Sequence, residues 1–235
     1  DKLHEFDLII FDRYKRQNVL PLAYLANVAQ FVEDGGAVLD AAGPAFATPY
    51  SLYRTPLASI LPAEPTGDVT IGTFRPQVTN TGHKHPVTAN LQGDASPTPQ
   101  WGSWFRVIDT NVARGDILME APNHKPLLVL DHAGKGRVAQ LMSDQFWLWS
   151  RGYEGGGPQS ELLRRLAHWL MKEPDLEEES LAATITGSTL SVKRRSMADT
   201  MGDAEVTSPS GKVTTLKLEE TAPGRFAGDM PAPEL

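Results

Sequence analysis

The first 42 residues alternate apolar and polar positions in a way that predicts a strand, a helix and a second strand. Residues 6–14 contain a short apolar run, which is typical of a strand buried on both faces. Between residues 18 and 33 the apolar positions recur at spacings of three and four, which predicts one face of a helix. Two glycines follow, and residues 37–42 form the next apolar run, so the pattern predicts a βαβ unit.

The middle of the chain has little periodicity. Residues 43–123 are rich in Pro, Thr, Gly and Asn, and they favour a long insertion of loops with strand-like pieces at 69–74 and 104–108. Apolar strands return at 127–130 and 137–142, and the glycine-bearing turn between them predicts a hairpin.

The last third of the chain changes its period from helical to alternating. A helix is predicted between Pro158 and Pro174, and the acidic stretch that follows is interpreted as a domain boundary. Four short alternating segments come next, too few to close a β-sandwich. We therefore expect an α/β domain over residues 1–180 and part of a β-sandwich over residues 181–235.

Composition removes several classes of function. The 235 residues carry a formal net charge of -7, and the basic run at 193–195 stands alone, so the pattern argues against a nucleic-acid partner. The chain has no cysteine, which excludes disulfides, cysteine-based zinc sites and a thiol nucleophile. No apolar run approaches the roughly 20 residues needed to cross a bilayer, so we expect that this segment does not span a membrane.

Several segments resemble the class I glutamine amidotransferase-like superfamily: DLIIFDRY, a helix ending in FVEDGG, AVLDAAGPAF and TPLASILP. The long segment from GKGRVAQ to KEPDLEEE is more similar to the divergent amidotransferase-like domains of large bacterial membrane-anchored proteins. The resemblance covers roughly residues 6–180. It implies a flavodoxin-like fold with a parallel sheet, followed by part of an immunoglobulin-like sandwich, and it implies that the family's first elements lie upstream of Asp1.

The resemblance also implies where a catalytic site would lie. Enzymes of the family carry a Cys on a strained strand-to-helix turn, activated by a His that a Glu orients. Ala42 occupies the nucleophile position here, and residues 141–145 contain neither the His nor the Glu. We therefore expect no amidotransferase activity, and we expect no cofactor.

Two histidines suggest a metal site. His83 and His85 are two apart, which on a strand would point both imidazoles to one face. His124, His132 and Asp131 are the candidate third ligands, and no spacing favours one of them. A structural role is the stronger interpretation, so we expect no bound metal.

These patterns favour a non-catalytic binding or scaffold module. The implied parent is a membrane-anchored bacterial envelope protein, with this region on the extracytoplasmic (periplasmic) side and a protein partner in the envelope. The alternative location is the cytoplasm. The alternative function is a hydrolase or metal-dependent enzyme that uses Asp12, Ser143 and Asp144 with one of the histidines at the carboxyl ends of the sheet.

Overall fold

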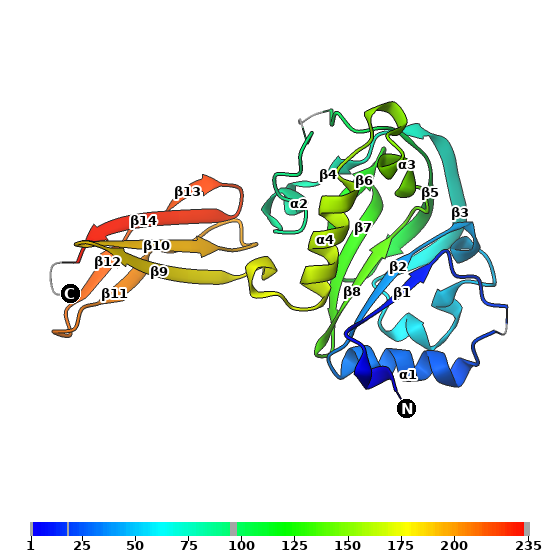
Figure 1. The fold of residues 1–235 in the computed structure, drawn as a ribbon, viewed down its shortest axis with the longest axis horizontal. Coiled ribbons are helices and arrows are strands. Elements are labelled where there is room, and N and C mark those ends of the chain that lie inside the picture. The colour runs from blue at the N-terminus through cyan, green and yellow to red at the C-terminus, as the bar shows by residue number, and fades with distance from the viewer. Residues whose placement is uncertain (1, 18, 95–97, 233–235) are drawn as a thin grey trace.

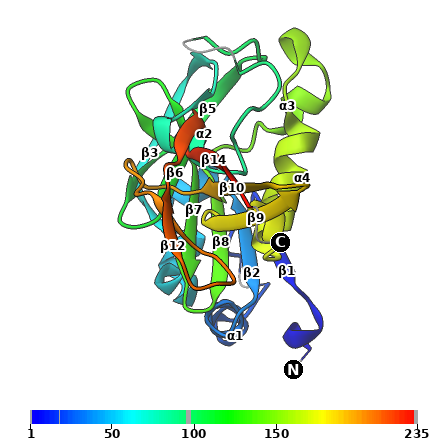
Figure 2. The same ribbon diagram turned by 90° about the vertical axis from the view of Figure 1, so that its left-hand side faces the viewer.

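The computed structural model describes residues 2–17, 19–94 and 98–232, and Figure 1 shows their arrangement. A larger part with a central sheet extends to the end of helix α4, Gln159–Leu170. The strands that follow project from one end of the larger part, beside α2 and α4 (Figures 1 and 2). Strand residues outnumber helical residues over the described ranges.

The central sheet has six strands in the order β1-β2-β8-β7-β6-β4. Their bounds are Leu8–Asp12, Ala37–Ala41, Gly136–Leu141, Lys125–Ala133, Asp116–Ala121 and Gln77–Val78. Only β1, β2 and β8 are parallel to one another, whereas β7, β6 and β4 add in antiparallel fashion. The sheet is therefore mixed.

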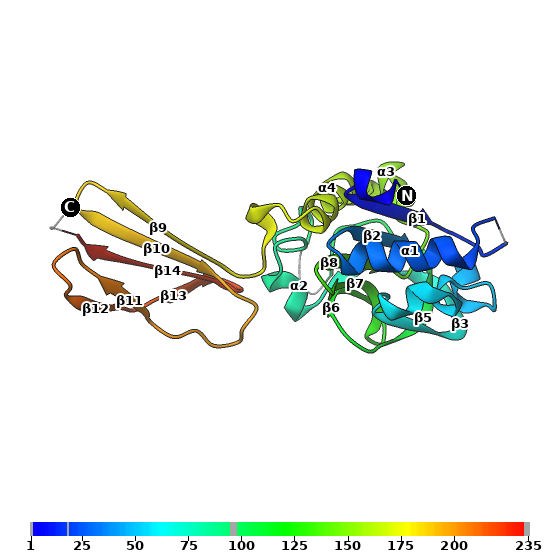
Figure 3. The same cartoon turned by 90° about the horizontal axis from the view of Figure 1, so that it is seen from below.

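Helices cover both faces of the parallel strands. Helix α1, Leu22–Glu33, and α4 both contact β2 and β8, and Figure 3 shows them on opposite sides of β1 and β2. Each helix buries one apolar stripe, as the spacings of three and four predict. The buried residues are Leu25, Val28, Ala29 and Val32 in α1 and Leu162, Leu166, Trp169 and Leu170 in α4.

The segment expected to be mostly loops contains a second, two-stranded sheet. Strands β3, Ala63–Phe74, and β5, Trp104–Val112, pair antiparallel. The short helix α2, Asn80–Lys84, packs against β6, and α3, Trp147–Ser150, packs against α4. Trp104 of β5 is fully buried and contacts the ring of Trp149 in α3 at a centroid distance of 4.8 Å, so an aromatic contact joins β5 to α3.

As far as residue 232, the last that the structure describes, the C-terminal part has six strands, not the four that the sequence predicts. Strands β9, β10, β13 and β14 form one antiparallel sheet, and β11 and β12 form a two-stranded one. In chain order from β9 to β14, the bounds of these strands are Ser180–Thr186, Thr189–Arg195, Ala204–Thr207, Val213–Leu216, Glu219–Ala222 and Arg225–Pro231.

The expected flavodoxin-like parallel sheet is wrong. Ala133 pairs with Gly136, so only Gly134 and Lys135 connect β7 to β8. A connection of two residues can join only antiparallel strands, because a parallel pair needs a crossover of roughly a dozen residues or more. The hairpin thus makes the second half of the sheet antiparallel, and the chain is richer in β-structure than the resemblance implied.

A carboxyl group lies in the middle of the sheet. Asp40 of β2 is 1% exposed, and its Oδ2 accepts a 3.1 Å hydrogen bond from Nε2 of Gln140 on the neighbouring β8. The amide oxygen of Gln140 accepts in turn from the Ala63 backbone N–H at 2.8 Å. Burial raises the pKa of Asp40 to about 7, although the Gln140 bond acts in the opposite direction.

Replacing Asp40 with Asn should stabilise the protein at alkaline pH. In the folded protein Asp40 stays protonated up to about pH 7, whereas in the unfolded chain its carboxyl group ionises above pH 3.8. The free energy of unfolding therefore falls as the pH rises from 3.8 to about 7. Asp40→Asn should remove this slope and recover up to about 4 kcal/mol at about pH 8. Urea denaturation at about pH 5 and about pH 8 measures both effects. Asp68→Asn, on the exposed part of β3, is the control and should keep the wild-type slope.

Candidate functional site

The carboxyl ends of the three parallel strands lie side by side, where open α/β sheets place ligands. Asp12 pairs with Ala41, and Ala41 pairs with Leu141, so the ends of β1, β2 and β8 are in register. The Ala42 backbone N–H donates to the Leu141 carbonyl at 2.8 Å. The structure thus brings the segments of Asp12, Ala42 and Ser143 to one edge, as the sequence suggested.

The turn at Ala42 is neither exposed nor strained. Ala42 is 2% exposed, and Gly43 after it has extended backbone angles, φ -97° and ψ -179°. The chain then enters a short 3-10 helix at Pro44–Ala47. Arg13, at the end of β1, is the residue here with a left-handed backbone, φ 49°. Its side chain lies close to Gly43, where an added Cβ would be 3.2 Å from the Arg13 Cβ.

The side chains of Ser143 and Asp144 are both bound within the fold. The Ser143 hydroxyl is fully buried and donates to the Arg106 carbonyl at 2.8 Å. Both carboxylate oxygens of Asp144 accept from the Arg106 guanidinium at 2.7 Å. This bidentate pair raises the pKa of Arg106. The two residues therefore attach the end of β8 to β5.

Asp12 stands apart from this pair. Its side chain is 71% exposed, and its nearest charged partner is the adjacent Arg13, with 3.7 Å between Oδ1 and Nε. None of the described contacts joins Asp12 to Ser143 or Asp144. The alternative catalytic group therefore shares an edge of the sheet without forming a hydrogen-bonded relay.

The two histidines of the suggested metal site have different partners. His83 lies in helix α2, and His85 follows its end, so the assumption that both lie on one strand is wrong. His83 Nδ1 is 3.3 Å from Asp94 Oδ2, whereas His85 Nε2 is 3.3 Å from Glu178 Oε1. Within the described ranges no group of three or more His, Asp or Glu residues could hold a metal ion.

The other candidate ligands also have partners within the fold, and His132 shares its partner with His85. His124 pairs with Glu120 on the surface, with 3.0 Å between Nδ1 and Oε2. Asp131 accepts from Arg114 at 2.6 Å. His132 contacts the same carboxylate oxygen as His85, the Oε1 of Glu178, at 3.2 Å.

Glu178 is the polar centre that the sequence did not reveal. Its Oε1 also accepts from the indole N–H of Trp169 at 2.8 Å. Burial alone would raise the pKa of Glu178, but the bonds from His132 and His85 outweigh it and hold that pKa well below its usual 4.5. The sequence signal for it is the acidic run before β9, which by itself predicts only a domain boundary.

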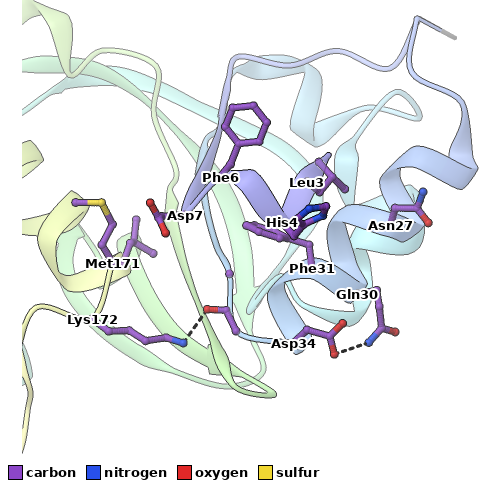
Figure 4. A pocket seen from close by; sticks show the side chains of 13 residues that line it. Leu3, His4, Phe6, Asp7, Asn27, Gln30, Phe31, Asp34, Met171 and Lys172 are labelled. Atoms are coloured by element: carbon purple, nitrogen blue, oxygen red, sulfur yellow. Dashed lines mark hydrogen bonds between the residues drawn. The ribbon is translucent and has the colours of Figure 1, made fainter. Parts of the chain in front are cut away.

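A pocket of about 530 Å³ lies at the opposite edge of the sheet, near the amino ends of β1 and β2. Figure 4 shows apolar side chains such as Phe6, Phe31 and Met171 around it. Some of its polar groups bind within the lining: Lys172 Nζ donates to the Gly35 carbonyl at 2.7 Å, and Gln30 donates to Asp34 at 3.1 Å. The side chains of Lys172, Gln30 and Asp34 are therefore already hydrogen-bonded within the fold.

Comparisons with known proteins identify a shared fold. The chain is similar to the cytoplasmic protein STM1381 from Salmonella typhimurium LT2, with a TM-score of 0.56 and 21% identity over 70% of this chain and 72% of that one. The cytoplasmic protein STM3548 from Salmonella typhimurium gives 0.56 and 20% over 72% and 73%. At these identities the likeness shows the fold alone.

A weaker likeness is to the β-galactosidase from Bacillus circulans sp. alkalophilus, with a TM-score of 0.46 and 13% identity. It covers 97% of this chain but only 34% of the enzyme. No protein-family model and no curated protein matches the chain. The mixed sheet overturns the flavodoxin-like description of the fold, and none of these three structures is named a glutamine amidotransferase.

Removing the Asp144 carboxylate should destabilise the fold. Asp144→Ala leaves the Arg106 guanidinium without its bidentate partner, and we expect a loss of about 2 kcal/mol in the free energy of unfolding. Chemical denaturation measures the loss. Asp12→Ala, with its exposed side chain, should change stability little. The double variant Arg106→Ala, Asp144→Ala should lose less than the sum of the single variants, and full additivity would contradict the pairing.

Proposed function

We propose that this chain is a non-catalytic binding or scaffold module whose partner is another protein. The observation that carries the proposal is the state of the carboxyl edge. Ala42, which the resemblance places at the position of a nucleophile, is buried and has only a methyl side chain. The Ser143 hydroxyl donates to a backbone carbonyl, and both oxygens of the Asp144 carboxylate are bound by Arg106. A nucleophile needs a base within hydrogen-bond reach, and these contacts leave Ser143 without one.

An apolar surface around β1 supports a protein partner. Phe6 and Tyr24 are both 58% exposed and line a groove of about 810 Å³ beside β1 and α1, and Ile10 of β1 is 54% exposed. Exposed apolar surface of this kind is typical of contacts with other proteins. The net charge of -7 argues against a nucleic-acid partner.

The location of the module is a second part of the proposal. Two of the similar structures are named cytoplasmic proteins, which favours the cytoplasm over the periplasmic side of an envelope protein. In the part of the chain that the structure describes, no helix is long and apolar enough to cross a membrane.

An activity screen tests the absence of catalysis. The chain should not turn over glutamine, ester, amide or phosphoester substrates, with or without divalent metals, because Ser143 and Asp144 are bound within the fold and no described contact joins Asp12 to them. The rival hydrolase or metal-dependent enzyme predicts turnover that Asp144→Asn or His85→Gln abolishes while the fold persists. Turnover that depends on Asp144 or His85, or stoichiometric metal retained by the purified chain, would refute the proposal that the module is non-catalytic.

A capture experiment tests the binding surface. Immobilised chain should retain a protein from cytosolic extract, and Phe6→Ser with Tyr24→Ser should weaken the retention by removing exposed apolar surface from the groove beside β1 and α1. Ile71→Ser is the matched control, because Ile71 is 82% exposed on β3 and lies outside this surface. If Ile71→Ser weakened the retention equally, the binding surface would not be the one beside β1. If a protein were retained from envelope extract and not from cytosolic extract, the module would belong to the envelope.

A further inference from the structure

Three separate elements of the larger part bind one carboxylate of the linker, which is the segment 171–179 between α4 and β9. Glu178 Oε1 accepts from Trp169 of α4 at 2.8 Å and lies 3.3 Å from His85, just after α2, and 3.2 Å from His132 of β7. The side chain of Glu178 is 16% exposed and that of His85 is 1% exposed. Glu178 is two residues before β9, so these contacts fix the point where the C-terminal strands leave the larger part.

The neighbouring glutamates extend the same contact in both directions. Glu177 accepts two bonds from Arg137 of β8, at 2.8 and 2.7 Å. Glu179 accepts from the Ser196 hydroxyl at 2.7 Å and from the Met197 N–H at 3.0 Å, both beyond the end of β10. Successive glutamates therefore bind the larger part and the C-terminal strands.

His85 and His132 differ in their hydrogen bonds and in their exposure to water. His85 is buried, and its Nδ1 accepts from the Val87 backbone N–H at 3.2 Å, which leaves the ring proton on Nε2 facing Glu178. The side chain of His132 is 57% exposed. Water can reach this ring, so His132 is the member of the cluster that exchanges protons readily.

The charges around His132 favour its protonated form. The bond to Glu178 raises the pKa of His132 above 6.5, and Asp131 of β7 acts in the same direction, whereas partial burial and Arg137 of β8 oppose the rise. The Trp169 ring of α4 lies edge to face with the imidazole, at a centroid distance of 5.6 Å. His85 reaches the cluster through the shared Glu178 oxygen.

We propose that the Glu178 cluster is a pH-sensitive latch between the larger part and the C-terminal strands, which protonation of His132 tightens and its deprotonation loosens. A protonated imidazole donates a charge-assisted hydrogen bond to the carboxylate, roughly twice as strong as a neutral one. The stabilisation by His132 is fully present below pH 6.5, and it is lost as the pH rises through the higher pKa that His132 has in the folded protein. Glu178 stays ionised well below 4.5, so the latch holds at mildly acidic pH.

Spin labels test the latch in the whole chain. Because the chain has no cysteine, Lys135→Cys in the β7–β8 turn and Thr215→Cys in β12 introduce one exposed pair of labels. Double electron–electron resonance should give a narrow distance distribution at about pH 5.5 and a broader one at about pH 8.5. The midpoint of the change should lie above the 6.5 of an ordinary histidine.

Two variants and a control separate the latch from general loosening. His132→Gln and Glu178→Gln keep hydrogen-bonding capacity but remove the charge pair, so both should abolish the change in width between the two pH values. His124→Gln alters another His–Glu pair, the surface pair of His124 with Glu120, and should respond as the wild type does. A wild-type width equal at both pH values, or a full response in His132→Gln, would overturn the proposal.

Discussion

The guanidinium of Arg137 is buried between β8, α4 and the acidic linker, where its charge has to be compensated by protein groups. Its side chain is 6% exposed. It donates to the Trp169 carbonyl at 2.6 Å, binds both carboxylate oxygens of Glu177 and lies 4.9 Å from the Trp169 ring centroid. A buried charge without partners is strongly destabilising, so the sheet, the last helix and the linker have to meet at this one position. The packing of α4 and the course of the linker both follow from that requirement.

Local patterns were sufficient for the elements around this core. The apolar runs predicted β1, β2, β7 and β8, and the helical spacings predicted α1 and α4, because each of these buries one face or both against the same core. The order and direction of the strands were not predicted. The flavodoxin-like expectation came from resemblance, although the two-residue turn at Gly134 and Lys135 already pointed to antiparallel pairing. In β3, Pro65 and two glycines obscure the alternation of a twelve-residue strand.

The site was harder to predict because its contacts join residues far apart in the sequence. Ser143 and Asp144 were identified as a possible relay, yet their partner Arg106 is 37 to 38 residues away and nothing in the spacing links them. His85 and Glu178 are 93 residues apart. Glu178 also lies within a run of acidic residues, where composition suggests a solvated linker and gives no reason to distinguish one carboxylate from the next.

That run of three glutamates has a consequence for how the linker can change over evolution. Glu177, Glu178 and Glu179 are chemically identical, but each has a different partner: a guanidinium, a pair of imidazoles with an indole, and a serine hydroxyl. Because the three side chains are identical, their position along the backbone after α4 decides which carboxylate reaches which partner. A conservative exchange within the run would keep that distance, whereas the insertion of a single residue would preserve the composition and shift every partner by one. Linker length, more than linker sequence, is therefore the quantity on which purifying selection should act.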